Sequence, residues 1–202
     1  MTDRPILIYS LIVFMNQVAT PKPRLLLHVC CGVCSAYIPE ILTPDYDVTM
    51  YYENSNIYPA EEFRRRADAA RTISEKYGAS FIEVSQQQDE WNLAVAGHAQ
   101  DPENGKRCEL CMSYRLDQAF QYAKNHQFDI VACTLGVSRR KQIEMVNTIG
   151  RILSEKYQIP FMDRDWKKNG GEVESQRRAK ESGIYRQDYC GCVYSMRKEN
   201  SK

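Results

Sequence analysis

Cysteine is the residue type in this chain with the greatest capacity for chemistry. Seven of the eight cysteines fall into three close groups, which are Cys30, Cys31 and Cys34, then Cys108 and Cys111, and finally Cys190 and Cys192. A fold can gather such thiolates to hold zinc or an iron–sulfur cluster, or to exchange with a disulfide. Buried cysteines often serve as small hydrophobic residues, which accounts for the isolated Cys133 but not for three groups.

The first two groups supply four thiolates when Cys30 and Cys31 are combined with Cys108 and Cys111. Four thiolates suffice for a four-iron cluster or for a tetrahedral zinc site, and the spacing does not choose between them. Cys34 lies one helical turn beyond the vicinal pair, where it could bind a second metal or be a buried structural thiol. The sequence therefore predicts metal binding and leaves the metal open.

The third group has a different character because a single glycine separates Cys190 from Cys192. A disulfide between them would close a small strained ring, and strained disulfides tend to be the labile or catalytic ones. We interpret the two residues as a redox-active pair, with two further metal ligands as the alternative.

Other chemical signatures are absent from the sequence. His28, His98 and His126 form no HExxH-type metal motif, and we interpret them as structural. No GxGxxG or GxxxxGK[ST] segment is present, so a tightly bound nicotinamide or ATP is unsupported.

Composition limits the class of protein. The chain has 202 residues, 43% hydrophobic and 26% charged, with a formal net charge of +1, which predicts one domain and excludes a surface that is basic everywhere. The apolar run from Pro5 to Met15 is shorter than the roughly 20 residues of a membrane span and lacks a signal-peptide cleavage site. We interpret it as a buried strand or an extension, and expect a cytoplasmic protein without membrane attachment.

Charge is uneven along the chain. From Arg164 onward ten basic residues outnumber six acidic ones, and four aromatic residues are interleaved with them: Trp166, Tyr185, Tyr189 and Tyr194. Such a region could bind phosphates and stack on unpaired bases, or be a solvated charged surface. Arg64, Arg65 and Arg66, together with Arg71, form a second basic candidate, with an exposed helix face as the favoured alternative.

Alternating strand and helix patterns position these residues. Strands are predicted at 24–29, 47–52, 80–84 and 128–134, and helices at 35–42, 60–77, 89–96, 109–125 and 140–157. The pattern predicts a three-layered α/β domain with a mostly parallel, Rossmann-like sheet. Ligands in such folds sit beyond the carboxyl ends of the strands, where Cys30 and Cys31 fall, so we expect the cysteine groups to gather at that rim.

Five ordered motifs give a family resemblance. They are His28–Ser35 (HVCCGVCS), Asn54–Pro59 (NSNIYP), Arg107–Cys111 (RCELC) followed by Arg115 and Leu116, Thr134 and Leu135 with Ser138, and Tyr185–Cys192 (YRQDYCGC). In this order they closely resemble the QueH family of epoxyqueuosine reductases, from about Leu25 to Ser195. Residues 1–23 fall outside the resemblance, and residues 24–202 are expected to form the single catalytic domain.

The resemblance implies the last step of queuosine biosynthesis. In that step two electrons remove the epoxide oxygen of epoxyqueuosine at the wobble position of a tRNA, without cobalamin and with an electron donor that the sequence does not identify. By the same resemblance Cys30, Cys31, Cys108 and Cys111 match the ligands of a 4Fe–4S cluster. Cys190 and Cys192 match the redox-active pair, and an additional iron beside the cluster has Cys34 as a candidate ligand.

Matching motif positions also give candidate substrate-binding residues: Asn54, Asn56, Arg107, Arg115, Ser138, Tyr185, Arg186, Gln187 and Tyr189. Deoxygenation needs a proton for the leaving oxygen, for which Tyr185, Asp188 and Tyr189 are the nearby candidates. Two other classes of function use similar cysteines. A zinc-stabilised RNA-binding module would be colourless, and a cluster-dependent tRNA sulfur-transfer enzyme would need an ATP site.

Overall fold

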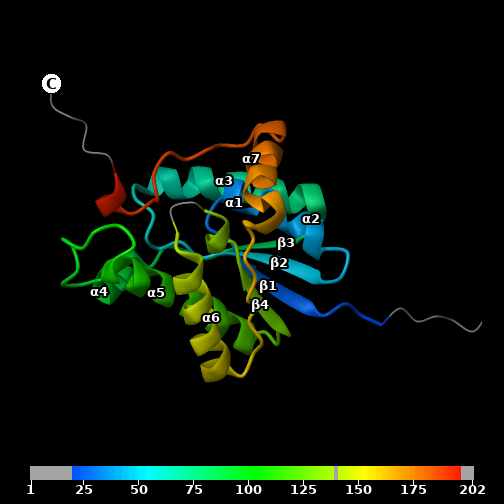
Figure 1. Cartoon of the computed structure of the whole chain (residues 1–202), viewed down its shortest axis with the longest axis horizontal. Helices are drawn as coiled ribbons and strands as arrows, with labels where there is room; N and C mark the ends of the chain where they lie inside the picture. The colour runs from blue at the N-terminus through cyan, green and yellow to red at the C-terminus, as the bar shows by residue number, and fades with distance from the viewer. Residues whose placement is uncertain (1–19, 139–140, 197–202) are drawn as a thin grey trace, which may run out of the picture.

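A parallel four-stranded sheet forms the centre of the molecule in the computed structural model, which describes residues 20–138 and 141–196. The strands are β1 (Arg24–His28), β2 (Asp47–Tyr52), β3 (Ser80–Glu83) and β4 (Ile130–Cys133), in the order β3-β2-β1-β4 (Figure 1). Their register sets Leu27 opposite both Met50 and Ala132. This confirms the predicted α/β class and the parallel sheet.

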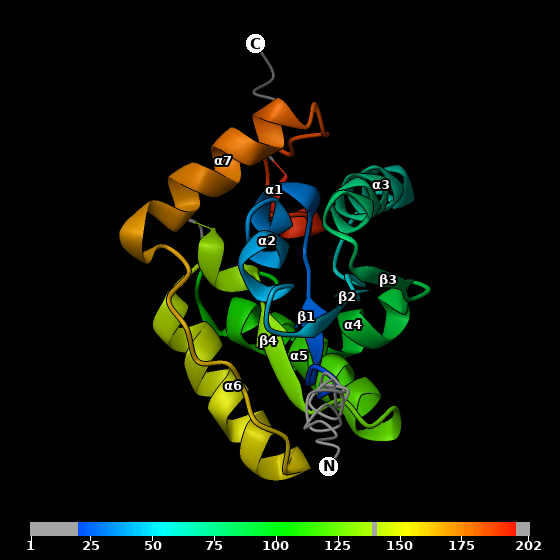
Figure 2. The same ribbon diagram turned by 90° about the vertical axis from the view of Figure 1, so that its right-hand side faces the viewer.

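Helices cover both faces of the sheet (Figures 1 and 2). One face carries α1 (Gly32–Ser35), α2 (Ile38–Leu42), α3 (Ala60–Tyr77) and α7 (Gly171–Glu181). The other carries α5 (Lys106–Asn125) and α6 (Ile143–Tyr157), with α4 (Gln88–Ala94) beside α5. Three short 3₁₀ helices complete the described chain: η1 (Leu135–Val137), η2 (Lys168–Gly170) and η3 (Val193–Ser195).

Side-chain alternation in β1 builds the two cores on either side of the sheet. Leu25 and Leu27 are fully buried beneath α1, α2 and α3, while Leu26 is fully buried against α5 and α6. Full burial of each leucine contributes about 1.5–3 kcal/mol to folding. Because β1 packs against apolar side chains on both faces, it fixes the cysteines that follow it at the carboxyl end of the sheet.

Two expectations about helices need correction. The helix predicted at 35–42 is divided into α1 and α2, because Pro39 stands in the first turn of α2 and a proline lacks the N–H that a continuous helix needs. Helix α7 was not predicted at all. The apolar run from Pro5 to Met15 lies outside the described residues, and no helix within them is long and apolar enough to cross a membrane.

Candidate active site

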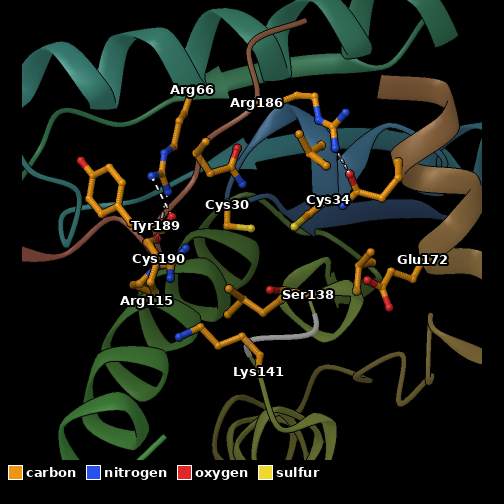
Figure 3. Close-up of a pocket in the computed structure, with 15 residues that line it drawn as sticks. Cys30, Cys34, Arg66, Arg115, Ser138, Lys141, Glu172, Arg186, Tyr189 and Cys190 are labelled. Atoms are coloured by element: carbon orange, nitrogen blue, oxygen red, sulfur yellow. Dashed lines mark hydrogen bonds between the residues drawn. The ribbon is translucent and has the colours of Figure 1, made fainter. Parts of the chain in front are cut away.

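A cavity of about 470 Å³ opens at the carboxyl end of the sheet. Its walls come from the residues after β1, from the segment that follows β4, from α7, and from residues 185–192, which we call the C-terminal strap (Figure 3). The lining residues are Cys30, Val33, Cys34, Arg66, Arg115, Leu135, Val137, Ser138, Lys141, Glu172, Gln176, Arg186, Gln187, Tyr189 and Cys190.

The turn from β1 into α1 brings three thiols together. Cys31 caps the helix, because its sulfur accepts the backbone N–H of Cys34 at 3.4 Å. The chain can turn this tightly because Gly32 lies against α3, where a β-carbon would come within 2.8 Å of the Ala69 side chain. As a result the sulfurs of Cys30, Cys31 and Cys34 all lie within 4.8 Å of one another.

These three sulfurs share negative charge. Thiol hydrogen bonds from Cys31 and Cys34 hold the pKa of Cys30 well below its usual range. The same bonds, together with burial, raise the pKa of Cys31 to about 12 and raise that of Cys34. A thiolate flanked by two thiols is a donor set that a soft metal ion can occupy by displacing the remaining protons.

Arg115 places a buried positive charge beside the thiols. Its guanidinium donates to the Oδ1 of Asn54, whose amide in turn donates to the carbonyl of Val29 at 2.9 Å. Burial alone would lower the pKa of Arg115, but the nearby Cys111, Cys30 and Glu53 raise it. A buried cation next to several sulfurs fits an anionic, thiolate-bound cluster, which would supply the compensating charge.

Cys108 and Cys111 lie on the first two turns of α5, and their sulfurs are outside the group formed by Cys30, Cys31 and Cys34. The sulfur of Cys108 accepts the backbone N–H of Asn104 at 3.2 Å. Cys111 packs against Trp91 and Cys192, and burial raises its pKa. The structure therefore places this pair near the cavity without bringing its sulfurs to the other three, and the four-ligand assignment stays a prediction.

Arg66 holds the strap in place. Its guanidinium donates to the carbonyls of Tyr189 at 3.1 Å and Cys190 at 2.9 Å, and forms a buried ion pair with Glu62 at 2.6 Å. Between the two cysteines Gly191 has a φ of +124°, and a β-carbon there would lie 2.9 Å from Arg66 Nη1. Glycine is thus required by both backbone conformation and space.

The two strap cysteines face different surroundings. Cys190 lines the cavity, and a hydrogen bond from the Cys192 thiol followed by the charge of Lys141 holds the pKa of Cys190 well below its usual range. Cys192 is buried against Trp91 and Val95, and its pKa is raised. The pair therefore presents one thiolate to the cavity and keeps the second sulfur behind it.

Comparison with known proteins decides the family. The family model of the epoxyqueuosine reductase QueH matches residues 25–198. The chain belongs to the QueH family. Curated QueH relatives include one from Streptococcus pyogenes, 37% identical with 87% of this chain and 71% of the relative aligned, and one from Thermotoga maritima, 33% identical with 88% and 92% aligned.

A solved structure shows the same fold. The U34-tRNA thiolase NcsA from Methanococcus maripaludis, determined with its 4Fe–4S cluster, superposes with a TM-score of 0.56 at 14% identity. The match covers 88% of this chain and 62% of the thiolase. At this identity the likeness concerns the fold alone.

Five of the QueH-motif residues predicted to bind substrate line the cavity: Arg115, Ser138, Arg186, Gln187 and Tyr189. Gln187 donates from Nε2 to the sulfur of Cys31 at 2.8 Å, and its own carbonyl oxygen is buried without a hydrogen-bond partner among the residues that the structure describes. Arg186 donates to Gln176 of α7 at 2.7 Å.

The other four predicted substrate-binding residues are not among the residues that line the cavity. Asn54 and Asn56 are buried in the loop after β2. Arg107 donates to the carbonyls of His98, Ala99 and Asp101, at 3.1, 3.0 and 2.6 Å. The hydroxyl of Tyr185 donates to Glu62 at 2.7 Å.

Two of the candidate proton donors have their protons directed elsewhere. Tyr185 donates to Glu62, as above, and the hydroxyl of Tyr189 donates to the carbonyl of Tyr58. Trp166, one of the four aromatic residues that could have stacked on bases, is buried, with its indole N–H donated to the carbonyl of Cys133 at 2.9 Å. It is not available for stacking because the segment after α6 packs back onto the sheet.

Four polar residues that line the cavity were not predicted as site residues: Arg66, Lys141, Glu172 and Gln176. Arg66 stands in an arginine triplet, and Lys141 follows Arg139 and Arg140, so both resembled exposed basic surface. Each is in fact nearly buried, with 2% and 8% of the residue exposed. Only the tertiary fold shows that these two side chains are buried.

Proposed function

We propose that this chain removes the epoxide oxygen of epoxyqueuosine at the wobble position of tRNA, giving queuosine. Membership of the QueH family makes it an oxidoreductase that acts on tRNA. The observation that carries the assignment to this site is the juxtaposition of Cys30, Cys34 and Cys190 around one cavity at the carboxyl end of a parallel sheet, with Cys31 grouped beside the first two.

The cofactor proposed here is a 4Fe–4S cluster bound by Cys30, Cys31, Cys108 and Cys111, with Cys34 available to an additional iron and with no role for cobalamin. Support comes from the clustered thiols and from Arg115, which offers a buried positive charge to an anionic cluster. When bound, the cluster would supply one-electron transfer and Lewis acidity next to the substrate.

Cys190 and Cys192 are proposed to supply the reducing equivalents. Both C–O bonds of the epoxide break, a C=C bond forms, and oxygen leaves as water after gaining two electrons and two protons. The dithiol releases two electrons and two protons as it becomes a disulfide, so the reaction balances. An external donor, of a kind that reduces disulfides, then restores the dithiol.

Substrate binding is assigned to the residues that line the cavity. Arg186, Tyr189 and Ser138 stand at its wall (Figure 3), where they can contact the modified base and its ribose, while Arg115 is buried and Gln187 donates to the sulfur of Cys31. We further propose that residues 24–202 form one catalytic domain and that the enzyme works in the cytoplasm, where its tRNA substrate and reductants are found.

Conversion of the modified nucleoside tests this function. Anaerobically reconstituted protein, incubated with a dithiol reductant and tRNA containing epoxyqueuosine, should yield queuosine on nucleoside mass spectrometry. The fold shared with a U34-tRNA thiolase motivates a parallel assay for sulfur incorporation at uridine 34 with ATP and a sulfur donor. Thiolated uridine without queuosine would refute the proposal and assign the chain to sulfur transfer.

A further inference from the structure

Lys141 carries a buried positive charge that no carboxylate in the described part of the chain balances. Only 8% of the residue is exposed, and within residues 20–138 and 141–196 no carboxylate lies within ion-pair distance of its ammonium. Burial alone would lower the pKa of Lys141, but the negative charges of Cys190, Cys108 and Cys111 raise it, so the side chain is an ammonium. A buried lysine without a carboxylate is costly to fold and is therefore a candidate for function.

The backbone around Lys141 holds the ammonium in the cavity. The backbone N–H of Lys141 donates to the carbonyl of Ser138 at 3.1 Å, and the backbone carbonyl of Lys141 accepts a hydrogen bond from the ammonium of Lys167 at 3.0 Å. From this anchored position the side chain runs along the cavity toward Cys190 and Arg115, across from Cys30 and Cys34 (Figure 3). A substrate group that enters between the thiols and α6 would therefore meet the ammonium.

The epoxide oxygen is the substrate atom that needs such a group. As its C–O bonds break it gains negative charge, and a positioned ammonium can stabilise that charge and transfer a proton. Arg115 is less suited to this task, because a guanidinium does not release its proton and this one is already bonded to Asn54.

Resting on the proposed function, we propose that Lys141 binds the epoxide oxygen of the substrate and delivers the first proton to it. The ammonium gives up one proton as the oxygen departs and regains one from the Cys192 thiol, while the second proton of the water comes from solvent, in place of the proton that Cys190 released when it became a thiolate. The net reaction remains epoxide plus dithiol giving alkene, disulfide and water.

The test compares two tRNAs that differ by the oxygen atom. Oxidised holoenzyme, which cannot turn over, is titrated with tRNA bearing epoxyqueuosine and with tRNA bearing queuosine. Wild type should prefer the epoxide by about tenfold or more, as expected for one charge-assisted hydrogen bond. Lys141→Met should bind both tRNAs equally, with the affinity of wild type for the queuosine form. Lys141→Arg should retain part of the preference.

Single-turnover rates supply the second measurement. Lys141→Met should form queuosine at least about 100-fold more slowly than wild type. Lys156→Met is the matched control, because Lys156 pairs with Asp117 on the surface of α6 and should behave as wild type in both assays.

Three results would overturn the inference. They are an undiminished epoxide preference in Lys141→Met, an equal loss of affinity for both tRNAs, which would make Lys141 a general tRNA contact, and loss of cluster iron in this variant, which would make it an assembly residue. Failure of the proposed function looks different, since wild type itself would then form no queuosine.

Discussion

Cys190 and Cys192 differ in their surroundings although one residue separates them. Cys190 faces the cavity beside Lys141, whereas Cys192 is buried against Trp91. Because the pKa of Cys190 is held low, it should be partly thiolate at pH 7, where Cys192, with its raised pKa, is a thiol. Iodoacetamide at pH 7 should therefore alkylate Cys190 before Cys192 in the reduced protein, as read by peptide mass spectrometry. Faster labelling of Cys192 would reverse the roles.

Serine replacements separate turnover from cluster assembly. Cys190→Ser and Cys192→Ser should keep the visible spectrum of the cluster, because neither sulfur is a proposed ligand, yet fail to form queuosine over repeated turnovers. Near-normal turnover would make the pair dispensable. Loss of iron would instead reassign these sulfurs as ligands.

The ligand assignment is testable at Cys108 and Cys111. Serine at either position should reduce bound iron from about four atoms per chain to about one or fewer. Cys133→Ala is the control, because the sulfur of Cys133 contacts His28 and the N–H of Leu135 outside the three-sulfur group. Full iron and sulfide in both serine variants, with loss in Cys34→Ser, would show that the group gathered by β1 and α1 is the ligand set instead.

Among elements, α3 controls the strap through Arg66. The planar guanidinium of Arg66 donates to two strap carbonyls and also pairs with Glu62. A lysine at this position would keep the charge but could not make both hydrogen bonds to the strap together with the ion pair. Arg66→Lys should leave the cluster spectrum intact, increase the alkylation rate of Cys190, and slow single turnover about tenfold. Arg71→Lys, in the exposed part of α3, is the matched control. An unchanged Cys190 alkylation rate in Arg66→Lys would refute the positioning role.

Element predictions succeeded where an apolar stripe or a capping residue marks the boundary. Helix α3 was predicted with its observed limits because Gly78 ends it in the left-handed conformation, at a φ of +65°. Helix α7 escaped prediction because its buried residues are Gly171, Ser175 and Ala179, a stripe of small side chains without an apolar period. At Gly171 a β-carbon would lie 2.0 Å from the Trp166 carbonyl oxygen, so the close approach itself demands the small residue.

Site predictions followed the same division. The cysteine groups and the strap could be recognised in the sequence because closely spaced cysteines are typical of metal-binding and redox sites. The parallel sheet then fixes the rim at which Cys30 and Cys34 meet. Lys141 and Arg66 could not be recognised, because charged residues in basic runs give no sign of which one turns inward. Burial of a charge depends on contacts between distant segments, such as α3 with the strap.

At the scale of the whole molecule, tRNA affinity depends on which exposed basic side chains are not already ion-paired with carboxylates. The basic C-terminal region was expected to meet phosphates, but Arg177 pairs with Glu174 and Glu181, and Arg178 with Glu40. Arg64 and Arg65 are exposed on α3 and, within the described chain, form no ion pair. Phosphate binding by α7 would have to displace its carboxylates, so we expect α3 to contribute more.

Charge reversal compares these two faces with equal changes in charge. Arg64→Glu with Arg65→Glu should weaken tRNA binding and reduce the slope of log affinity against log salt by about 1.4–1.8, whereas Arg177→Glu with Arg178→Glu should change it less. Circular dichroism would confirm that both proteins are folded. The opposite ranking would place the tRNA backbone along α7.

Dependence of activity on the cluster is the most direct test of the whole account. Protein reconstituted anaerobically to a series of iron and sulfide contents should form queuosine in tRNA in proportion to its sulfide, with no product from chelated, metal-free protein and none from zinc-loaded protein. Equal rates of queuosine formation in the metal-free or zinc-loaded protein would contradict an iron–sulfur mechanism at this site.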